Sequence, residues 1–307
     1  MTDTKLTDTK LTDTKLTDTK LTEAGLEPDA VRSLVRNALA EDLGWGPDVT
    51  TRSTIGADAT AQAAVVSRAA GVIAGVPAAL ATMEELAAQQ GTSVAAVVIT
   101  GDGGRVEPGT EVLRFEGPVH TLLTAERTLL NLLGQLSGVA TATAQWVAAV
   151  AGSGARIRDT RKTVPGLRVL QKYAVRCGGG VNHRMGLGDA ALIKDNHVAA
   201  AGSITAALNA VRDHAPHVPV EVECDNLEQV TEAIAAGAHT ILLDNMDAST
   251  MRQAVELARA APGPVMLEAS GGLTLDRAAE VAATGVDYLA IGALTHSAPV
   301  LDLGLDV

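Results

Sequence analysis

Hydrophobic residues between positions 61 and 117 occur in short runs separated by turns rich in glycine and proline. This spacing is typical of β-strands, and longer stretches with few breakers nearby indicate helices. The elements expected in this half are strands at residues 63–67, 94–100 and 111–115, and helices at residues 30–43 and 77–90. The pattern therefore predicts an N-terminal α+β domain of the open-sandwich type.

The pattern changes after Gly154, where short apolar strands alternate with alanine-rich helices. We expect strands at residues 156–159, 190–193, 218–222, 240–243, 264–267 and 287–291. Helices are expected between them, for example at residues 204–213, 227–236, 249–260 and 275–284. Because apolar strands joined by helices build parallel sheets, these units predict an α/β fold with a partial (β/α) barrel as the C-terminal domain.

A single long helix is predicted between the two patterns, at residues 124–150, with Thr124 as its N-cap. We place the domain boundary inside this helix. The N-terminal domain then covers residues 23–130 and the barrel covers residues 131–296, while residues 297–307 are left to pack with the N-terminal domain.

The chain begins with the pentad TDTKL, which is repeated four times up to Leu21. A leucine every five residues changes face on a strand and advances by about 140° around a helix, so neither structure would bury the leucines together. We therefore expect residues 1–22 to form a disordered tail whose removal leaves activity intact.

Composition excludes several classes of protein. The 307 residues carry a formal net charge of −12, which argues against nucleic-acid binding, and the two cysteines, Cys177 and Cys224, are too few for a disulfide framework or a zinc site. No apolar run approaches the roughly 20 residues of a membrane span, so we expect a cytoplasmic protein without membrane contact. Within this acidic chain, residues 156–197 contain nine basic and three acidic residues. Such a concentration of positive charge indicates an anionic substrate.

Polar or glycine-rich residues follow each predicted strand of the second half. Since the carboxyl ends of parallel strands meet at one edge of a sheet or barrel, we expect these residues to converge on one site. The segments after the strands are Thr160–Thr163, Lys194–His197, Glu223–Asp225, Asp244–Asn245, Glu268–Gly272 and Gly292–Leu294.

The residue types in these segments suit a phosphorylated or carboxylated ligand. Arg161, Lys162 and the pair His183 and Arg184 are donors for carboxylates and phosphates, although a surface salt-bridge network is the alternative interpretation. Glu223 and Asp244 would hold Mg²⁺ or sugar hydroxyls, unless they are helix N-caps or a structural ion pair. The loops at 270–272 and 292–294 are similar to phosphate-binding loops of barrel enzymes.

At these residues the sequence resembles the quinolinate phosphoribosyltransferase family. The resemblance covers nearly all of the chain after residue 23. It is carried by EDLGWGPDVTT (41–51), LLTAERTLLNLLGQLSGVATAT (122–143), RDTRKTVPGLRVLQKYAV (158–175), GGGVNHRMGLGDAALIKDNHV (178–198), ILLDNM (241–246), LEASGGL (267–273) and DYLAIGALTHS (287–297).

The resemblance implies a reaction, a cofactor and an assembly. Quinolinate and phosphoribosyl pyrophosphate would give nicotinate mononucleotide, pyrophosphate and CO₂, with Mg²⁺ required. The family is a homodimer in which the residue matching Arg127 reaches the barrel of the partner subunit.

The resemblance also implies roles for individual residues. Catalytic roles fall on Lys162, Lys194, Glu223 and Asp244, the last two also serving as Mg²⁺ ligands directly, through water or through substrate. The substrate-binding positions are Arg127, Thr160, Arg161, Lys162, His183, Arg184, Lys194, Glu223, Asp244, Ser270, Gly271, Gly272, Gly292, Ala293, Leu294 and His296.

Three other functions fit the same residues. A phosphoribosyltransferase acting on nicotinate or another pyridine-like acceptor needs a similar set of cations. A barrel aldolase would use Lys162 or Lys194 to form a Schiff base. A non-catalytic module would bind the phosphosugar without releasing pyrophosphate.

Overall fold

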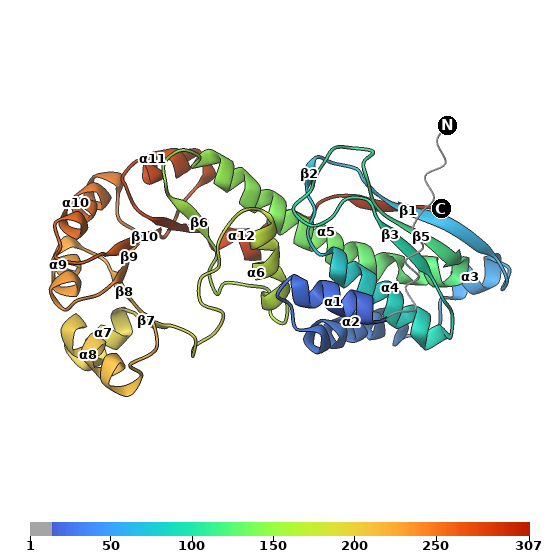
Figure 1. Cartoon of the computed structure of the whole chain (residues 1–307), viewed down its shortest axis with the longest axis horizontal. Coiled ribbons are helices and arrows are strands. Elements are labelled where there is room, and N and C mark those ends of the chain that lie inside the picture. Colours follow the sequence, from blue (N-terminus) through green and yellow to red (C-terminus); the bar gives the residue numbers. More distant parts are fainter. Residues whose placement is uncertain (1–13) are drawn as a thin grey trace. The chain divides into compact units, whose positions relative to one another are not determined.

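The computed structural model describes residues 14–307, with side chains from residue 17 onward (Figure 1). The described chain forms two compact units. The first unit contains the described residues up to Ala142 together with Pro165–Gly178 and Ala298–Val307, and the second contains Thr143–Val164 and Gly179–Ser297. Helix α5 (Val119–Ala149) runs from the first unit into the second, so the chain passes between units within one helix.

The first unit is built on a four-stranded antiparallel sheet in the order β12-β1-β5-β3. Its strands are β1 (Thr60–Ser67), β3 (Ala95–Val98), β5 (Glu111–Pro118) and β12 (Leu303–Asp306), and a small second sheet pairs β2 (Gly71–Val72) with β4 (Arg105–Val106). The helices of this unit besides α5 are α1 (Thr14–Glu23), α2 (Pro28–Leu43), α3 (Val49–Thr54), α4 (Val76–Gln90) and α6 (Arg168–Cys177). The α+β class predicted for this half is confirmed, and β12 brings the C-terminal segment into its sheet.

Helix α5 begins five residues before the predicted N-cap, Thr124. Strand β5 ends at Pro118 and α5 starts at Val119, so no loop separates them. Thr124 lies within the helix, where its hydroxyl donates to Oδ2 of Asp48 at 3.3 Å. The prediction was wrong here because a strand that continues directly into a helix leaves no turn residues in the sequence.

Helix α1 corrects the prediction that residues 1–22 form a disordered tail, since residues 14–22 are helical; residues 1–13 lie outside the described residues. The fourth TDTKL repeat packs against α2 and α4. Leu21 is fully buried, the hydroxyl of Thr17 donates to Glu84, and Asp18 pairs with Arg32 at 2.8 Å. A single repeat needs to bury only one leucine, so the five-residue period does not prevent docking.

Helix α6 changes the interpretation of the basic segment 156–197. It carries Arg168, Lys172 and Arg176 and belongs to the first unit, whereas the strands on either side of it belong to the second. Lys172 is almost fully buried, and Arg176 donates to the backbone oxygen of Ala24 at 2.8 Å. Part of the positive charge that is concentrated in the sequence is therefore used in packing the first unit.

The second unit contains a six-stranded parallel sheet in the order β6-β11-β10-β9-β8-β7. The strands are β6 (Arg156–Arg158), β7 (Ala191–Ile193), β8 (Val220–Cys224), β9 (Thr240–Asp244), β10 (Met266–Ser270) and β11 (Tyr288–Ala290). The helices around it are α7 (Asp195–Ala201), α8 (Ile204–His214), α9 (Leu227–Ala235), α10 (Ala248–Arg259), η1 (Leu275–Arg277), α11 (Ala278–Ala282) and α12 (Ala293–His296). All six predicted strands are confirmed, with their ends shifted by at most three residues.

The register of this sheet brings the ends of neighbouring strands to the same level. Glu223 of β8 lies opposite Leu242 of β9, and Asp244 of β9 lies opposite Ser270 of β10. The polar residues at these strand ends consequently share one edge, as parallel pairing requires.

Both cysteines are free thiols. Burial raises the pKa of Cys177 to about 11 and that of Cys224 to about 12, so both are protonated at neutral pH. Among residues 14–307, no helix is long and apolar enough to span a bilayer.

The docking of α1 predicts that Leu21→Ala lowers the free energy of unfolding by roughly 2–5 kcal/mol, because it leaves a cavity where a leucine was buried. Urea unfolding of the full chain measures this. Thr19→Ala is the matched control, since Thr19 belongs to the same repeat but is exposed. If both substitutions changed the free energy of unfolding equally, burial of Leu21 would not stabilise the protein.

Candidate active site

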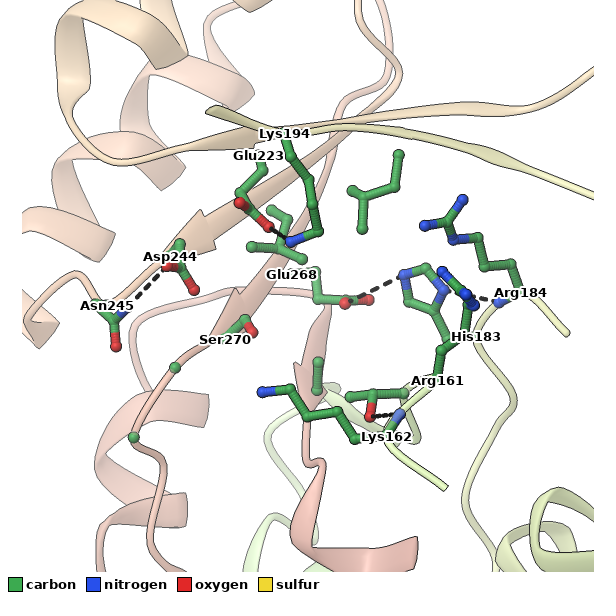
Figure 2. Close-up of a pocket in the computed structure, with 16 residues that line it drawn as sticks. Arg161, Lys162, His183, Arg184, Lys194, Glu223, Asp244, Asn245, Glu268 and Ser270 are labelled. Carbon is green, nitrogen blue, oxygen red and sulfur yellow. Dashed lines mark hydrogen bonds and ion pairs between the residues drawn. The ribbon is translucent and has the colours of Figure 1, made fainter. Parts of the chain in front are cut away.

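A pocket of about 450 Å³ opens at the carboxyl ends of the parallel strands, within the second unit (Figure 2). Its volume lies in the range of small-molecule sites. Eleven of its lining residues were predicted from the sequence: Thr160, Arg161, Lys162, His183, Arg184, Lys194, Glu223, Asp244, Ser270, Gly271 and Gly272. The remaining lining residues are Leu192, Leu242, Asn245, Glu268 and Ala290.

One side of the pocket carries two guanidinium groups. Arg161 follows β6, and Arg184 follows Val181, which forms a parallel bridge with Arg158 of β6, so both arginines lie beyond the carboxyl end of β6 (Figure 2). Burial and the facing charge of Arg161 lower the pKa of Arg184 from its ordinary value. Two neighbouring arginines that repel each other favour an anion that neutralises both of them.

The opposite side combines ammonium and carboxylate groups. Lys194, at the end of β7, forms an ion pair with Glu223 at the end of β8. Asp244, at the end of β9, accepts a hydrogen bond from the Asn245 amide at 2.7 Å. This side therefore presents both a cation and acidic hydrogen-bond acceptors, a combination that suits a phosphorylated sugar better than a simple anion.

Backbone hydrogen bonds fix the loops that carry these side chains. Asp159, which is fully buried, accepts from the backbone N–H of His183 at 2.8 Å and from the side chain of Asn182, and so joins the segment after β6 to the glycine-rich segment. The Thr160 hydroxyl accepts from the backbone N–H of Lys162 at 3.0 Å. Thr295 donates to the Lys162 carbonyl at 2.7 Å, which holds the same turn from the other side.

His197 has a structural role at the next strand exit. Its Nδ1 accepts from the backbone N–H of Lys194 at 2.9 Å. This bond belongs to the capping arrangement at the start of α7. His197 therefore fixes the backbone from which the Lys194 side chain enters the pocket.

The loop after β10 depends on a close approach between two backbone segments. Gly271 has φ +87°, and a Cβ placed there would lie 2.2 Å from Oδ1 of Asn245 and 2.9 Å from its backbone nitrogen. Asn245 is itself in the left-handed region, with φ 54°. Glycine is needed at 271 both for its conformation and for space, so the Ser270–Gly272 loop can lie against Asn245.

The five other predicted site residues do not line this pocket. Gly292 lies beside it, because a Cβ there would lie 3.0 Å from Cδ of Lys162. Leu294 is buried, whereas Ala293 and His296 are exposed, and His296 Nδ1 lies 2.6 Å from the Ser297 hydroxyl. Arg127 belongs to the other unit, on α5, with its side chain 65% exposed.

Glu223 and Asp244 offer a donor set that fits Mg²⁺. They supply two carboxylates at neighbouring strand ends, with the Asn245 amide and the Ser270 hydroxyl in the same pocket. Mg²⁺ typically takes one or two protein carboxylates and completes its coordination with water and substrate phosphates. In this structure Glu223 pairs with Lys194, so binding the ion through Glu223 requires that this pair open.

A layer of buried charge lies at the base of the pocket, and the interactions within it were not predicted. Glu268 of β10 and Glu221 of β8 are buried, and both face the ring of His183. Arg158 of β6 donates to Oε2 of Glu268 at 2.7 Å and lies over the ring of Tyr288, 4.2 Å from its centre. Arg158, Glu221 and Tyr288 lie within strands that the sequence predicted, whereas Glu268 was predicted only as the first residue after its strand. A glutamate inside a buried strand is unusual and marks such a position.

The geometry of the Gly271 loop predicts different effects of two alanine substitutions. Gly271→Ala would force Asn245 away and is expected to weaken binding of inorganic pyrophosphate by about tenfold or more. Gly272→Ala meets no atom within 4 Å, so it should cost only the strain of its φ of +59°, roughly 1–2 kcal/mol of stability. Titration calorimetry and thermal unfolding measure the two effects, and equal pyrophosphate affinities would contradict the packing described.

Known proteins match this chain along nearly its whole length. Family models of the quinolinate phosphoribosyl transferase N-terminal and C-terminal domains match residues 48–137 and 139–306. The carboxylating nicotinate-nucleotide pyrophosphorylase of Mycobacterium leprae is 53% identical over 281 residues, which cover 92% of this chain and 98% of that protein.

Solved structures agree with these sequence matches. The nicotinate-nucleotide pyrophosphorylase from Francisella tularensis has a TM-score of 0.83 and 37% identity, covering 91% of this chain and 96% of that one. The NadC structure from Streptococcus pyogenes has a TM-score of 0.86 and 37% identity, covering 92% and 97%. The two-unit fold and the sequence identity lead to one conclusion: the chain belongs to the quinolinate phosphoribosyltransferase family.

Proposed function

We propose that this protein is a decarboxylating quinolinate phosphoribosyltransferase, a pentosyltransferase of NAD biosynthesis. It converts quinolinate and phosphoribosyl pyrophosphate to nicotinate mononucleotide, pyrophosphate and CO₂. The observation that carries the proposal is the division of one pocket into a guanidinium side and a side with ammonium and carboxylate groups (Figure 2). A dicarboxylate and a phosphorylated sugar need these two different environments next to each other.

The acceptor binds on the guanidinium side. Quinolinate brings two adjacent carboxylates, which match the facing pair Arg161 and Arg184. Neutralising both arginines with one dianion removes their mutual repulsion. This binding also fixes the pyridine nitrogen relative to the sugar.

The phosphoribosyl group binds on the opposite side. Lys194 and Lys162 supply charge for the pyrophosphate, Glu223 and Asp244 accept hydrogen bonds from ribose hydroxyls, and the Ser270–Gly272 loop faces a phosphate. The segment Gly292–Leu294 and His296 extend the phosphate-binding surface beside Lys162. When Lys194 turns to the pyrophosphate, Glu223 is released from its ion pair.

Bond formation depends on placement and charge. Departure of pyrophosphate leaves positive charge on the sugar C1, which the pyridine nitrogen captures from its position on the arginines. Lys162 and Lys194 stabilise the negative charge that develops on the leaving group. Loss of CO₂ follows from the quaternised ring, whose positive nitrogen stabilises the electron pair left at C2. A proton from water then forms the C–H bond at C2, so the protein need not supply a dedicated acid and base for that step.

Mg²⁺ is part of the proposal as a cofactor that neutralises pyrophosphate oxygens. Glu223 and Asp244 are the residues that would hold it, directly, through water or through substrate. The proposal also places the enzyme in the cytoplasm. It includes a homodimer in which Arg127 of one subunit completes the acceptor site of the other, as the family resemblance implies.

A pyrophosphate-release assay and a trapping experiment distinguish the proposed function from the three alternatives. Comparable turnover of nicotinate would indicate a phosphoribosyltransferase with a different acceptor. Phosphosugar binding without pyrophosphate release would indicate a non-catalytic module. A Schiff-base aldolase would leave a label on Lys162 or Lys194 after borohydride trapping with a carbonyl substrate.

Substitution of Arg161 tests recognition of the acceptor. Arg161→Ala should reduce kcat/KM for quinolinate by about tenfold to a hundredfold, because one charged hydrogen-bonding group is lost from a partly buried site. The KM for phosphoribosyl pyrophosphate should change much less. Steady-state kinetics that follow pyrophosphate release, with nicotinate as the comparison acceptor, measure both values. A larger effect on phosphoribosyl pyrophosphate than on quinolinate would contradict the assignment of the two sides.

Mixing of variants tests whether Arg127 acts across subunits. Arg127→Ala and Lys194→Ala are each expected to be nearly inactive, yet subunit exchange between them restores one intact site in each mixed dimer. Activity should then recover to about a quarter of the wild-type value, since half the dimers are mixed and each has one of two sites. The control mixture of Arg161→Ala and Lys194→Ala should show no recovery, because both substitutions lie in the same barrel. Equal behaviour of the two mixtures would exclude a contribution in trans.

A further inference from the structure

Two hydroxyl groups hold the backbone of Lys162 from opposite sides. The N–H of Lys162 donates to Oγ1 of Thr160 at 3.0 Å, and the carbonyl oxygen of Lys162 accepts from Oγ1 of Thr295 at 2.7 Å. Thr295 is only 1% exposed, so water does not compete for its bond. Side chains on both sides therefore fix the position of the Lys162 backbone.

The two hydroxyls come from distant parts of the sequence. Thr160 follows β6, whereas Thr295 lies 133 residues after Lys162, in α12 beyond β11. These strands are neighbours in the parallel sheet, where Arg158 pairs with Ala290, and the Arg158 carbonyl accepts from the next backbone N–H of the β11 segment at 2.9 Å. The hydrogen bond from Thr295 continues this connection beyond the ends of the two strands.

The side chain of Lys162 packs against the same turn of the chain. A Cβ at Gly292 would lie 3.0 Å from Cδ of Lys162 and 3.5 Å from Oγ1 of Thr160. The Gly292 carbonyl lies 3.2 Å from the Thr295 hydroxyl, farther than the Lys162 carbonyl at 2.7 Å, so the hydroxyl donates mainly to Lys162. The segment from Gly292 to Thr295 thus contacts both the backbone and the stem of Lys162.

This arrangement directs Lys162 to one side of the pocket. Figure 2 shows the Lys162 side chain pointing away from Arg161 and Arg184, although Arg161 is its neighbour in sequence. A lysine side chain has many rotamers, and a binding site loses affinity when it has to order such a side chain. Fixing the backbone and the stem before the substrate arrives lowers this loss.

We propose that Thr295 is a positioning residue for the phosphoribosyl substrate, because its hydroxyl holds Lys162 where the ammonium group meets the pyrophosphate. Thr295 does not line the pocket, so it acts through Lys162. The inference rests on the proposed function for the identity of the substrate. The hydrogen bond and the packing of Lys162 are independent of that function.

Substitution of the hydroxyl tests the positioning role by steady-state kinetics. Thr295→Val keeps the shape of the side chain but removes the donor, so the KM for phosphoribosyl pyrophosphate should rise by about tenfold and kcat should fall severalfold. The Kd of quinolinate, measured by calorimetry without the second substrate, should change by less than about twofold, since Arg161 and Arg184 bind it. Thr295→Ser keeps the donor and should resemble the wild type.

Thr284→Val is the matched control. Thr284 is also buried, and its hydroxyl donates to the Val281 carbonyl at 2.6 Å. It lies in the same unit, but before β11, at the opposite end of the strand from Thr295. Loss of this hydroxyl should lower the thermal stability and leave the KM for phosphoribosyl pyrophosphate unchanged, which is what a purely structural role of Thr295 would also predict for Thr295→Val.

Nuclear magnetic resonance tests the position of Lys162 without any substrate. The chain has seven lysines, so isotope-labelled methyl groups attached to the lysine amines give few signals. Lys162→Arg identifies the signal of Lys162 by its loss. In the substrate-free protein, Thr295→Val should shift or broaden this signal, whereas Thr295→Ser and Thr284→Val should leave it in place.

The outcomes separate this inference from the proposed function. A Lys162 signal that is unchanged in Thr295→Val, or a KM that changes equally in Thr295→Val and Thr284→Val, would overturn the inference. If Thr295→Val does not fold, as judged by thermal unfolding, Thr295→Cys replaces it, because a thiol fits the same space but is a weak donor. Absence of turnover with quinolinate would remove the proposed function, and the Lys162 signal would still show whether Thr295 holds this lysine.

Discussion

Parallel pairing of six strands controls where the chemistry of this protein takes place. The strands enter the sheet in the same direction, so their carboxyl ends, and the loops that follow, lie along one edge. In-register pairing then sets Glu223, Asp244 and Ser270 at the ends of three neighbouring strands. These three residues are at least 20 positions apart in the sequence, and strand pairing brings them together into one site.

The pocket gathers several cations within a chain that is acidic as a whole. The charge of Arg161 lowers the pKa of Arg184, so the two guanidinium groups repel each other. Asp159 accepts a hydrogen bond from the backbone of His183 and so fixes the segment that carries Arg184. Opposite them, Lys194 is balanced by Glu223. The pocket thus has two kinds of charge, two guanidinium groups on one side and an ammonium–carboxylate pair on the other.

The same sheet also contains buried charged residues at the base of the pocket. Glu221 and Glu268 lie at inward positions of β8 and β10, where most strands have apolar residues. Arg158 pairs with Glu268 at 2.7 Å, and Nε2 of His183 lies 2.7 Å from Oε2 of Glu221. The layer also contacts the segment that carries Arg184, because the His183 ring interacts with both Glu221 and the Arg184 backbone.

The sequence by itself determined the alternation of strands and helices, the α/β class, and the residues at the strand exits, because burial of apolar strands in a parallel sheet imposes a strong local pattern. Tertiary structure alone decided the features that depend on interactions between segments far apart in the sequence. Helix α6 makes three basic residues of segment 156–197 part of the first unit. One TDTKL repeat forms a helix that interacts with Arg32 and Glu84. The same holds for Glu268, whose charge depends on Glu221, His183 and Arg158. The energy of a buried charge is set by neighbours in space, and no pattern along the chain records which neighbours those will be.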